Sequence, residues 1–190
     1  MGKYSRELSE QHMSFIRRQA LFFTATAPSD DGRINVSPKG YDTFVIVDPQ
    51  TVAYLDYAGS GNETANHLRD NGKITFMWCS FDADPLILRI YGFGRVIEKG
   101  TIEYLEWMNE RFPAVKPEAA RQIMVCEVEM VQTSCGFGVP LMHVEGERAK
   151  LNEWSEGQLA KGSLDDYIAK NSPRLEAKFP LRSSSVDSLE

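Results

Sequence analysis

The sequence predicts a mainly β fold with peripheral helices, built as a β-barrel or sandwich of six to seven antiparallel strands. From Leu21 to Gln132 the apolar residues come mostly in short runs of the length of a strand. The segments between these runs are rich in Pro, Gly, Asp and Ser, the residues that form tight turns. Because the connections are short, we expect neighbouring strands to pair as hairpins.

Each element follows from its own local pattern. Six strands and a seventh are expected at Leu21–Ala27, Arg33–Lys39, Phe44–Val47, Thr51–Tyr57, Lys73–Phe81, Leu86–Glu98 and Gln122–Gln132. Apolar residues at helical spacing and polar residues suited to helix starts predict the helices. These helices are expected at Ser9–Ala20, Asn62–Asn71, Thr101–Phe112, around Leu151–Leu159 and at Ser163–Asn171.

The composition restricts the class of protein. In 190 residues there are 21 Lys and Arg against 27 Asp and Glu, a net charge of −6, which does not favour binding to nucleic acid. There is no apolar run of the roughly 20 residues that cross a bilayer, and no apolar block follows the N-terminus as in a signal peptide. We therefore expect a cytoplasmic protein that binds neither nucleic acid nor membrane.

The cysteines and histidines predict neither a disulfide framework nor a metal site. The three cysteines, Cys79, Cys126 and Cys135, are widely spaced and form no CxxC pair. The histidines, His12, His67 and His143, are equally scattered, and no two stand at the spacing of metal ligands on one helix face. Reduced thiols and the absence of a bound metal are the expectation.

The domain organisation is expected to be simple. Residues 1–140 hold the β domain with its N-terminal helix, and residues 141–182 are a charged helical extension of the same domain. The serine-rich residues 183–190 have little to bury, so a flexible tail is expected there.

The strand expected at Arg33–Lys39 has two chemically different faces. Its apolar side is Ile34, Val36 and Pro38, and its polar side is Asn35, Ser37 and Lys39. The apolar side is expected to face a core. The polar side is either an outer face in solvent or the wall of a ligand site, and solvent is the simpler interpretation.

Two further patterns have a functional and a structural interpretation. The glycine-containing turn Ala58–Thr64 leads into a helix, so its backbone N–H groups suit an anion, although such a turn also serves as a simple helix cap. In the strand Leu86–Glu98 the alternation places Arg89 and Arg95 on one face with two aromatic residues. That face suits either a flat anionic ligand or a dimer interface, and Gly92 and Gly94 on the other face indicate close backbone approach.

The order of motifs resembles that of the pyridoxamine 5'-phosphate oxidase-related flavoproteins, over about Leu8 to Val139. The motifs are Ile34-Asn35-Val36-Ser37-Pro38-Lys39-Gly40, Val52-Ala53-Tyr54-Leu55-Asp56, Gly61-Asn62-Glu63-Thr64-Ala65-Asn66-His67-Leu68-Arg69 and Leu88-Arg89-Ile90-Tyr91-Gly92-Phe93-Gly94-Arg95-Val96. The resemblance implies an FMN-binding split β-barrel and a homodimer with the cofactor at the subunit interface.

The same resemblance implies a set of cofactor-binding residues. They are Asn35, Val36, Ser37, Pro38, Lys39, Tyr54, Asp56, Gly61, Asn62, Glu63, Thr64 and Arg89. Ser37 and Lys39 are expected near the isoalloxazine, the turn Asn62–Thr64 at the phosphate, and Arg89 beside the cofactor, acting across the dimer. At the phosphate turn the biosynthetic oxidase carries a basic pair where this chain has Glu63 and Thr64.

These departures shape the functional hypothesis. The oxidase's C-terminal arginine and tryptophan elements are not recognisable after Pro140, which argues against pyridoxamine phosphate oxidation itself. The first hypothesis is an FMN-dependent oxidoreductase acting on a small organic substrate, with no catalytic residue assigned. The alternatives are a non-catalytic flavin or haem sensor dimer, with His67 or His143 as haem ligand, and a deazaflavin-dependent reductase.

Overall fold

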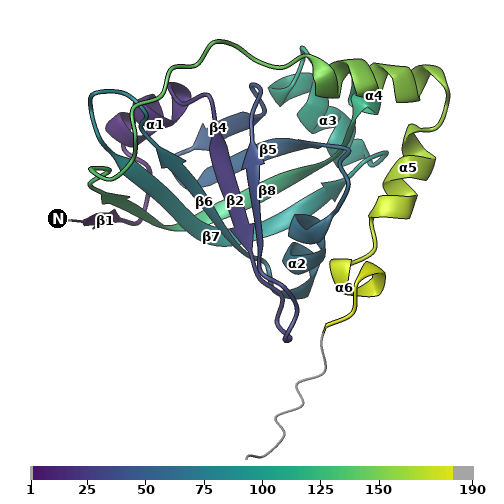
Figure 1. The fold of residues 1–190 in the computed structure, drawn as a ribbon, viewed down its shortest axis with the longest axis horizontal. Helices are drawn as coiled ribbons and strands as arrows, with labels where there is room; N and C mark the ends of the chain where they lie inside the picture. Colours follow the sequence, from purple (N-terminus) through teal and green to yellow (C-terminus); the bar gives the residue numbers. More distant parts are fainter. Residues whose placement is uncertain (1, 182–190) are drawn as a thin grey trace, which may run out of the picture.

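The computed structural model describes residues 2–181 and contains a single antiparallel β-sheet with helices around it (Figure 1). The eight strands are β1 (Lys3–Ser5), β2 (Phe22–Thr26), β3 (Asn35–Lys39), β4 (Phe44–Asp48), β5 (Thr51–Tyr57), β6 (Lys73–Cys79), β7 (Ile87–Glu98) and β8 (Ala120–Ser134). The helices are α1 (Glu10–Arg17), α2 (Glu63–Asn71), α3 (Ile102–Arg111), α4 (Lys150–Ala160), α5 (Leu164–Asn171) and α6 (Leu175–Lys178).

The sheet curls into a split barrel. Its strands follow the order β3-β2-β6-β7-β8-β5-β4, and β1 pairs with the far end of β8. Within residues 2–181, β3 and β4 share no ladder, so the barrel is open between these two strands. The long strands β7 and β8 pair along Ile87–Glu98 and form the middle of the sheet, away from the split.

The predicted mainly β fold is confirmed, and all seven expected strands are present within a few residues of their expected ends. The pairs β2–β3, β4–β5 and β6–β7 are hairpins as expected. The prediction is wrong for β3 and β4, because their short connection joins the two edges of the split. The sequence pattern also missed β1 and α6, which at three and four residues are too short to show a period.

Aromatic side chains fill the interior of the barrel and hold its two edges together. Phe22 of β2 packs edge to face against Phe44 of β4, with ring centroids 5.0 Å apart. Trp78 of β6 lies 4.8 Å from Phe44, and Tyr54 and Phe76 complete the cluster. These contacts cross the split where no backbone hydrogen bond does, so side-chain packing closes the barrel.

A second apolar cluster forms on the outside of the sheet under α3. Tyr104 and Met108 of this helix are 1% exposed and pack against Leu55, Ile97 and Ile123 of the neighbouring strands. Thr101 accepts a hydrogen bond from the Tyr104 amide and so caps the start of α3. The expected helix is therefore present, but Ile102 and Leu105, which share the helical spacing of Met108, are 78% and 47% exposed, so only part of that spacing faces the sheet.

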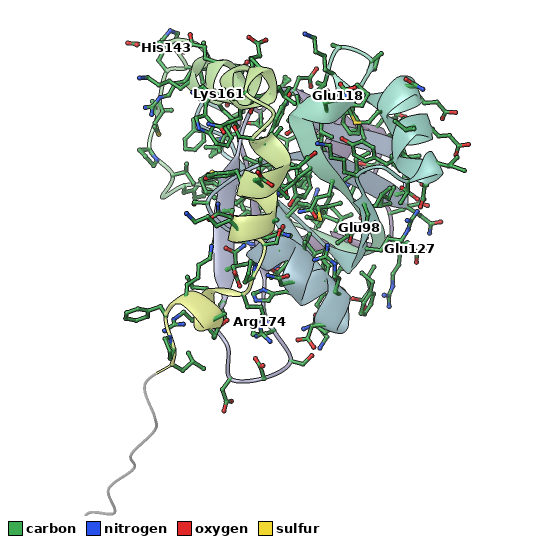
Figure 2. The ribbon with its side chains drawn as sticks, turned by 90° about the vertical axis from the view of Figure 1, so that its right-hand side faces the viewer. Glu98, Glu118, Glu127, His143, Lys161 and Arg174 are labelled. Carbon is green, nitrogen blue, oxygen red and sulfur yellow. The ribbon has the colours of Figure 1, made fainter. Side chains whose placement is uncertain are left out.

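The C-terminal segment crosses the barrel and descends beside α2. In Figure 1 the chain leaves β8, passes over the top of the barrel to α4 and then runs down through α5 and α6. The amide of Asn66 in α2 donates to the Ser172 carbonyl at the end of α5, at 3.0 Å. Figure 2 views the molecule from this side, with Arg174 at α6 and Lys161 at the end of α4.

Ion pairs fix α6 to the hairpin formed by β2 and β3. Arg174 makes two hydrogen bonds to Asp30 in the connection of that hairpin, at 2.9 and 3.0 Å. Arg33 pairs with Glu176, and its guanidinium also lies over the Phe179 ring.

Three helices are present between residues 141 and 181, where a helical extension was expected. The tail expected at 183–190 lies outside the described residues.

One expectation about β3 is wrong. The apolar side of this strand was expected to face a core, but Ile34 and Val36 are 74% and 60% exposed. The polar side, with Asn35, Ser37 and Lys39, is partly buried. Because β3 is an edge strand of the split, its inward face meets a cavity and not the aromatic interior.

The structure also bears on the cysteines and on membrane insertion. Cys79, Cys126 and Cys135 are all free thiols. No helix within residues 2–181 combines the length and the apolar character needed to cross a bilayer.

The close approach expected at Gly92 gives a test of the fold. A Cβ at this position would lie 2.1 Å from the Glu127 carbonyl oxygen and 2.6 Å from the Cys126 sulfur. We predict that Gly92→Ala lowers the free energy of unfolding by about 1–3 kcal/mol or more, as overpacking does, measured by urea denaturation. In the control Gly157→Ala the new methyl meets nothing within 4 Å. Because Ala favours a helix more than Gly does, the free energy of unfolding is expected to rise by up to about 1 kcal/mol. Equal stability of both variants would contradict this account of β7 and β8.

Candidate functional site

A cavity of about 490 Å³ lies at the open side of the barrel, within the size range of small-molecule sites. Its walls are β3, the end of β5, the loop Ala58–Gly61 and the first residues of α2. Tyr41 and Thr43 border it from the connection between β3 and β4, Arg121 borders it from β8, and Leu151 from α4. The cavity therefore combines segments from most of the chain.

The polar side of β3 forms one wall of the cavity. Asn35, Ser37 and Lys39 all line it, and Pro38 borders it. The Asn35 amide donates to the Thr64 hydroxyl at 3.2 Å, which ties β3 to α2. The interpretation of this side as a ligand-facing wall is thus the one that the geometry favours over an outer face in solvent.

A buried carboxylate organises the positive charge of the site. Asp56 is 2% exposed, and its Oδ1 accepts from the Lys39 ammonium at 2.8 Å. Its Oδ2 accepts from Arg121 Nε at 2.7 Å and from the Gln122 amide at 2.9 Å. Two cations thus share one carboxylate, which leaves a net charge of about +1 at this end of the cavity.

The same contacts set the protonation of Asp56. Burial raises the pKa of this carboxyl, but the nearby charges of Lys39 and Arg121 and the hydrogen bonds from Lys39 and Gln122 outweigh it and lower the pKa to about 2. Asp56 is therefore ionised at every physiological pH. The Lys39 ammonium also lies 5.4 Å from the centre of the Tyr54 ring, a cation–π contact beneath the cavity wall.

Arg121 has donor capacity that the protein does not use. Its side chain is only 6% exposed, and Asp56 occupies its Nε alone. Among the described residues its buried Nη1 has no hydrogen-bond partner. A buried guanidinium nitrogen without an acceptor is costly, so a ligand that supplies an acceptor here would gain a charge-assisted hydrogen bond.

The start of α2 forms a further wall of the cavity, the α2 end, which the Gln122 amide connects to the Asp56 carboxylate. Gly61, Glu63 and Thr64 line the cavity there. Asn62 stands at the N-cap position but makes no cap, because its side chain is buried and accepts from the Gln122 amide at 2.6 Å. The first N–H groups of α2 are therefore without the side-chain acceptor that Asn usually supplies.

Four of the expected cofactor-binding residues do not line the cavity. Val36 points to the outer face of β3, Tyr54 lies fully buried in the barrel interior, and Asn62 lies behind the wall. Arg89 stands on the outward side of β7, where it donates to the Ser134 hydroxyl at 3.3 Å. Within one chain the positive charge of the cavity comes from Lys39 and Arg121, and the role expected for Arg89 across a dimer stays a prediction.

Sequence patterns missed several residues of the site, among them Thr43, Tyr57 and Leu151 as well as the three that follow. Arg121 and Gln122 carried no signal, because a strand start with two polar residues is unremarkable until its register with β5 is known. Tyr41 has a φ of 58°, a left-handed conformation that is uncommon outside glycine, and this value is not readable from the sequence. Its hydroxyl donates to the Arg148 carbonyl and so connects the cavity rim to the C-terminal segment.

Comparison with known proteins identifies the family. The family described as pyridoxamine 5'-phosphate oxidase matches residues 8–135 of this chain, 128 of its 190 residues. This chain belongs to the pyridoxamine 5'-phosphate oxidase family. The resemblance inferred from the order of motifs is therefore confirmed.

Individual members of the pyridoxamine 5'-phosphate oxidase family support this assignment. The family protein ustO of Aspergillus flavus is 36% identical over 202 residues, which cover 98% of this chain and 81% of that protein. Two solved structures share the fold. A variant of HupZ from Group A Streptococcus has a TM-score of 0.52 at 20% identity, covering 66% of this chain and 98% of that chain. A Lactobacillus delbrueckii protein provisionally named a pyridoxamine 5'-phosphate oxidase has a TM-score of 0.53 at 15% identity, covering 67% and 94%.

The part of the chain beyond the family region also takes part in the site. Leu151 of α4 lines the cavity, and the Arg148 carbonyl accepts a hydrogen bond from the Tyr41 hydroxyl. Both Arg148 and Leu151 lie after residue 135. The oxidase family region thus supplies the barrel and most of the cavity, and the C-terminal helices add to its rim.

The low pKa of Asp56 gives a prediction for stability against pH. Because the folded-state pKa lies below the ordinary value of 3.8, Asp56 stabilises the fold above pH 4, and this contribution is lost as the pH falls toward 2. The shift corresponds to about 2 kcal/mol. The variant Asp56→Asn lacks this titration. The difference between its free energy of unfolding and that of the wild-type chain is therefore expected to shrink by about this amount as the pH falls from 5 to 2.

The matched control is Asp31→Asn, at an exposed position of the connection between β2 and β3. Its difference from the wild-type chain is expected to stay constant over the same pH range, as followed by urea denaturation. A constant difference for Asp56→Asn as well would contradict the assignment of the buried ion pairs.

Proposed function

We propose that this chain binds a flavin in the cavity between β3 and α2 and serves as an oxidoreductase for a small organic substrate. The observation that carries the proposal is the cationic end of the cavity, where Lys39 and Arg121 surround one buried carboxylate and the guanidinium retains an unused donor. When bound, the flavin supplies the hydride chemistry, which no side chain of a protein can supply alone. The protein then binds it, orients it and tunes its charge.

The charge of Lys39 and Arg121 suits the polar edge of a flavin ring. Reduction places negative charge on that edge, and fixed cations in a partly dry site stabilise such charge more strongly than water does. Asp56 holds both cations in place and lowers the net charge to about +1. The ring edge would therefore meet Lys39 and Arg121.

The remaining length of the cavity suits the tail of the cofactor. Lys39 and Asn35 stand four residues apart on β3, which is about 13 Å along an extended strand. A flat ring at Lys39 and a chain of hydroxyls past Ser37 and Asn35 would follow this wall toward α2. FMN is the flavin that the family resemblance implies. Its phosphate would reach the α2 end, where the basic pair of the biosynthetic oxidase is replaced by Glu63 and Thr64.

The alternatives to a flavin have less support. His67 is 1% exposed, bonded through Nδ1 to the Thr26 hydroxyl at 2.9 Å, and does not line the cavity. His143 lies exposed on the segment that crosses the barrel (Figure 2). Neither histidine therefore offers a haem ligand to this cavity. A deazaflavin shares the ring edge that Lys39 and Arg121 would meet, so it is included in the binding test below.

We also propose that the protein acts as a homodimer with the cofactor at the subunit interface, as the family resemblance implies. An apolar outer face of the barrel supports this proposal. Ile34, Val36 and Phe93 are each more than half exposed. Ile34 and Phe93 border a second, shallow cavity of about 350 Å³ on the outer side of β2, β6 and β7. A second copy covering this face would remove these side chains from water.

Flavin binding is tested by fluorescence titration with FMN, riboflavin and a deazaflavin. We predict that binding to the wild-type chain quenches the fluorescence of at least one of these three ligands. Lys39→Gln is expected to weaken that binding by about 10- to 100-fold, the value of one charge-assisted hydrogen bond. The control Lys161→Gln, at the exposed end of α4, is expected to bind as the wild type does. A chain that binds none of the three ligands would refute the proposed function.

The dimer is tested by light scattering after size exclusion. We predict that two chains of 21.4 kDa elute together, and that Phe93→Asp shifts the protein to a single chain because a carboxylate would be buried at the interface. In the control, Leu105→Asp places the same charge on the exposed side of α3, where we expect no change. A single-chain mass for the wild type at micromolar concentration would exclude the homodimer.

A further inference from the structure

The α2 end of the cavity carries a negative charge. Glu63 is the first residue of α2 and lines the cavity, with its side chain only 14% exposed. A carboxylate in the first turn already interacts favourably with the helix dipole, so it takes the electrostatic role that a bound anion would have. The end of the cavity where a phosphate would be expected is thus occupied by a fixed carboxylate.

The Glu63 carboxylate lies beside the buried His67 ring. Its Nε2 lies 3.8 Å from Glu63 Oε2, one helical turn further along α2. The imidazole is itself fixed, because its Nδ1 bonds to Thr26 at 2.9 Å and the ring is buried. Among the described residues, His67 Nε2 has no hydrogen-bond partner, and the Glu63 carboxylate lies just beyond hydrogen-bond distance from it.

The nearby cations are paired with other carboxylates. Among residues 2–181, no Lys or Arg nitrogen lies within 4.0 Å of the Glu63 carboxylate. Lys39 and Arg121 pair with Asp56, with Arg121 Nη1 alone left without a partner, and Arg69 pairs with Glu98. Lys178 reaches the turn before α2, where it donates to the Ser60 carbonyl at 3.3 Å and to the Asn171 side chain at 3.2 Å.

We infer that this cavity selects a flavin whose tail ends in hydroxyl groups over one that ends in a phosphate, and that Glu63 determines this selectivity. The inference rests on the proposed flavin function and specifies its ligand. A phosphate can only accept hydrogen bonds and would place two negative charges beside the carboxylate. A hydroxyl donates to the carboxylate and still accepts from the uncapped N–H groups at the start of α2. Riboflavin is the ligand with this chemistry.

The test compares riboflavin with FMN in equilibrium fluorescence titrations at one ionic strength. The wild-type chain is expected to bind riboflavin about tenfold or more tightly than FMN. Glu63→Gln, which keeps the size and removes the charge, is expected to tighten FMN until the two affinities agree within about threefold. The control Glu110→Gln on the exposed side of α3 is expected to keep the wild-type ratio.

The possible outcomes separate this inference from the proposed function. If the wild-type chain binds FMN as tightly as riboflavin or more tightly, the inference is overturned and the flavin function stands. A preference for FMN that disappears in Lys178→Gln would also overturn the inference, because the Lys178 ammonium would then be the group that binds the phosphate. If riboflavin, FMN and the deazaflavin all fail to bind, both proposals fail. The wild-type ratio decides the selectivity even if Glu63→Gln does not fold.

Discussion

The Asp56 carboxylate is the contact on which the geometry of the cavity depends. It joins β5, where it resides, to β3 through Lys39 and to β8 through Arg121 and Gln122. Gln122 continues the network to Asn62 at the start of α2. Buried ion pairs contribute little net stability, but removal of one partner leaves an uncompensated charge and costs several times more. The network therefore acts mainly to fix the positions of β3, β8 and α2 around the cavity.

The aromatic interior and the cavity use different residues. Phe22, Phe44 and Trp78 close the split by packing, while the polar wall of β3 faces the cavity. Tyr54 lies between the two regions, buried in the interior with Lys39 over its ring. Substitutions at Asn35 or Ser37 therefore change the cavity wall without disturbing the packing that holds the barrel together.

Local chemistry made the strands and turns predictable, because alternation and turn residues act over a few positions. The same alternation distinguished the apolar face of β3 from its polar face, but it did not show which of the two faces points into the molecule. An apolar face normally turns inward, and only the position of β3 at the split leaves Ile34 and Val36 exposed. Arg121 lies 65 residues from Asp56, so their contact depends on the register of β5 against β8, which tertiary packing sets. Arg89 was assigned from strand alternation and from the order of motifs, and within one chain its side chain lies on the outward side of β7.

The position of β3 at the edge of the sheet affects how a ligand enters and leaves. The strand has one hydrogen-bonded neighbour, β2, so its detachment breaks one ladder and exposes little of the aromatic interior. Local openings of this kind cost less free energy than global unfolding and set the exchange rates of enclosed ligands. The ion pairs of Arg174 with Asp30 and of Arg33 with Glu176 oppose the movement of this hairpin. If the proposed ligand enters past β3, α6, which lies outside the family region, would slow its exchange through these ion pairs.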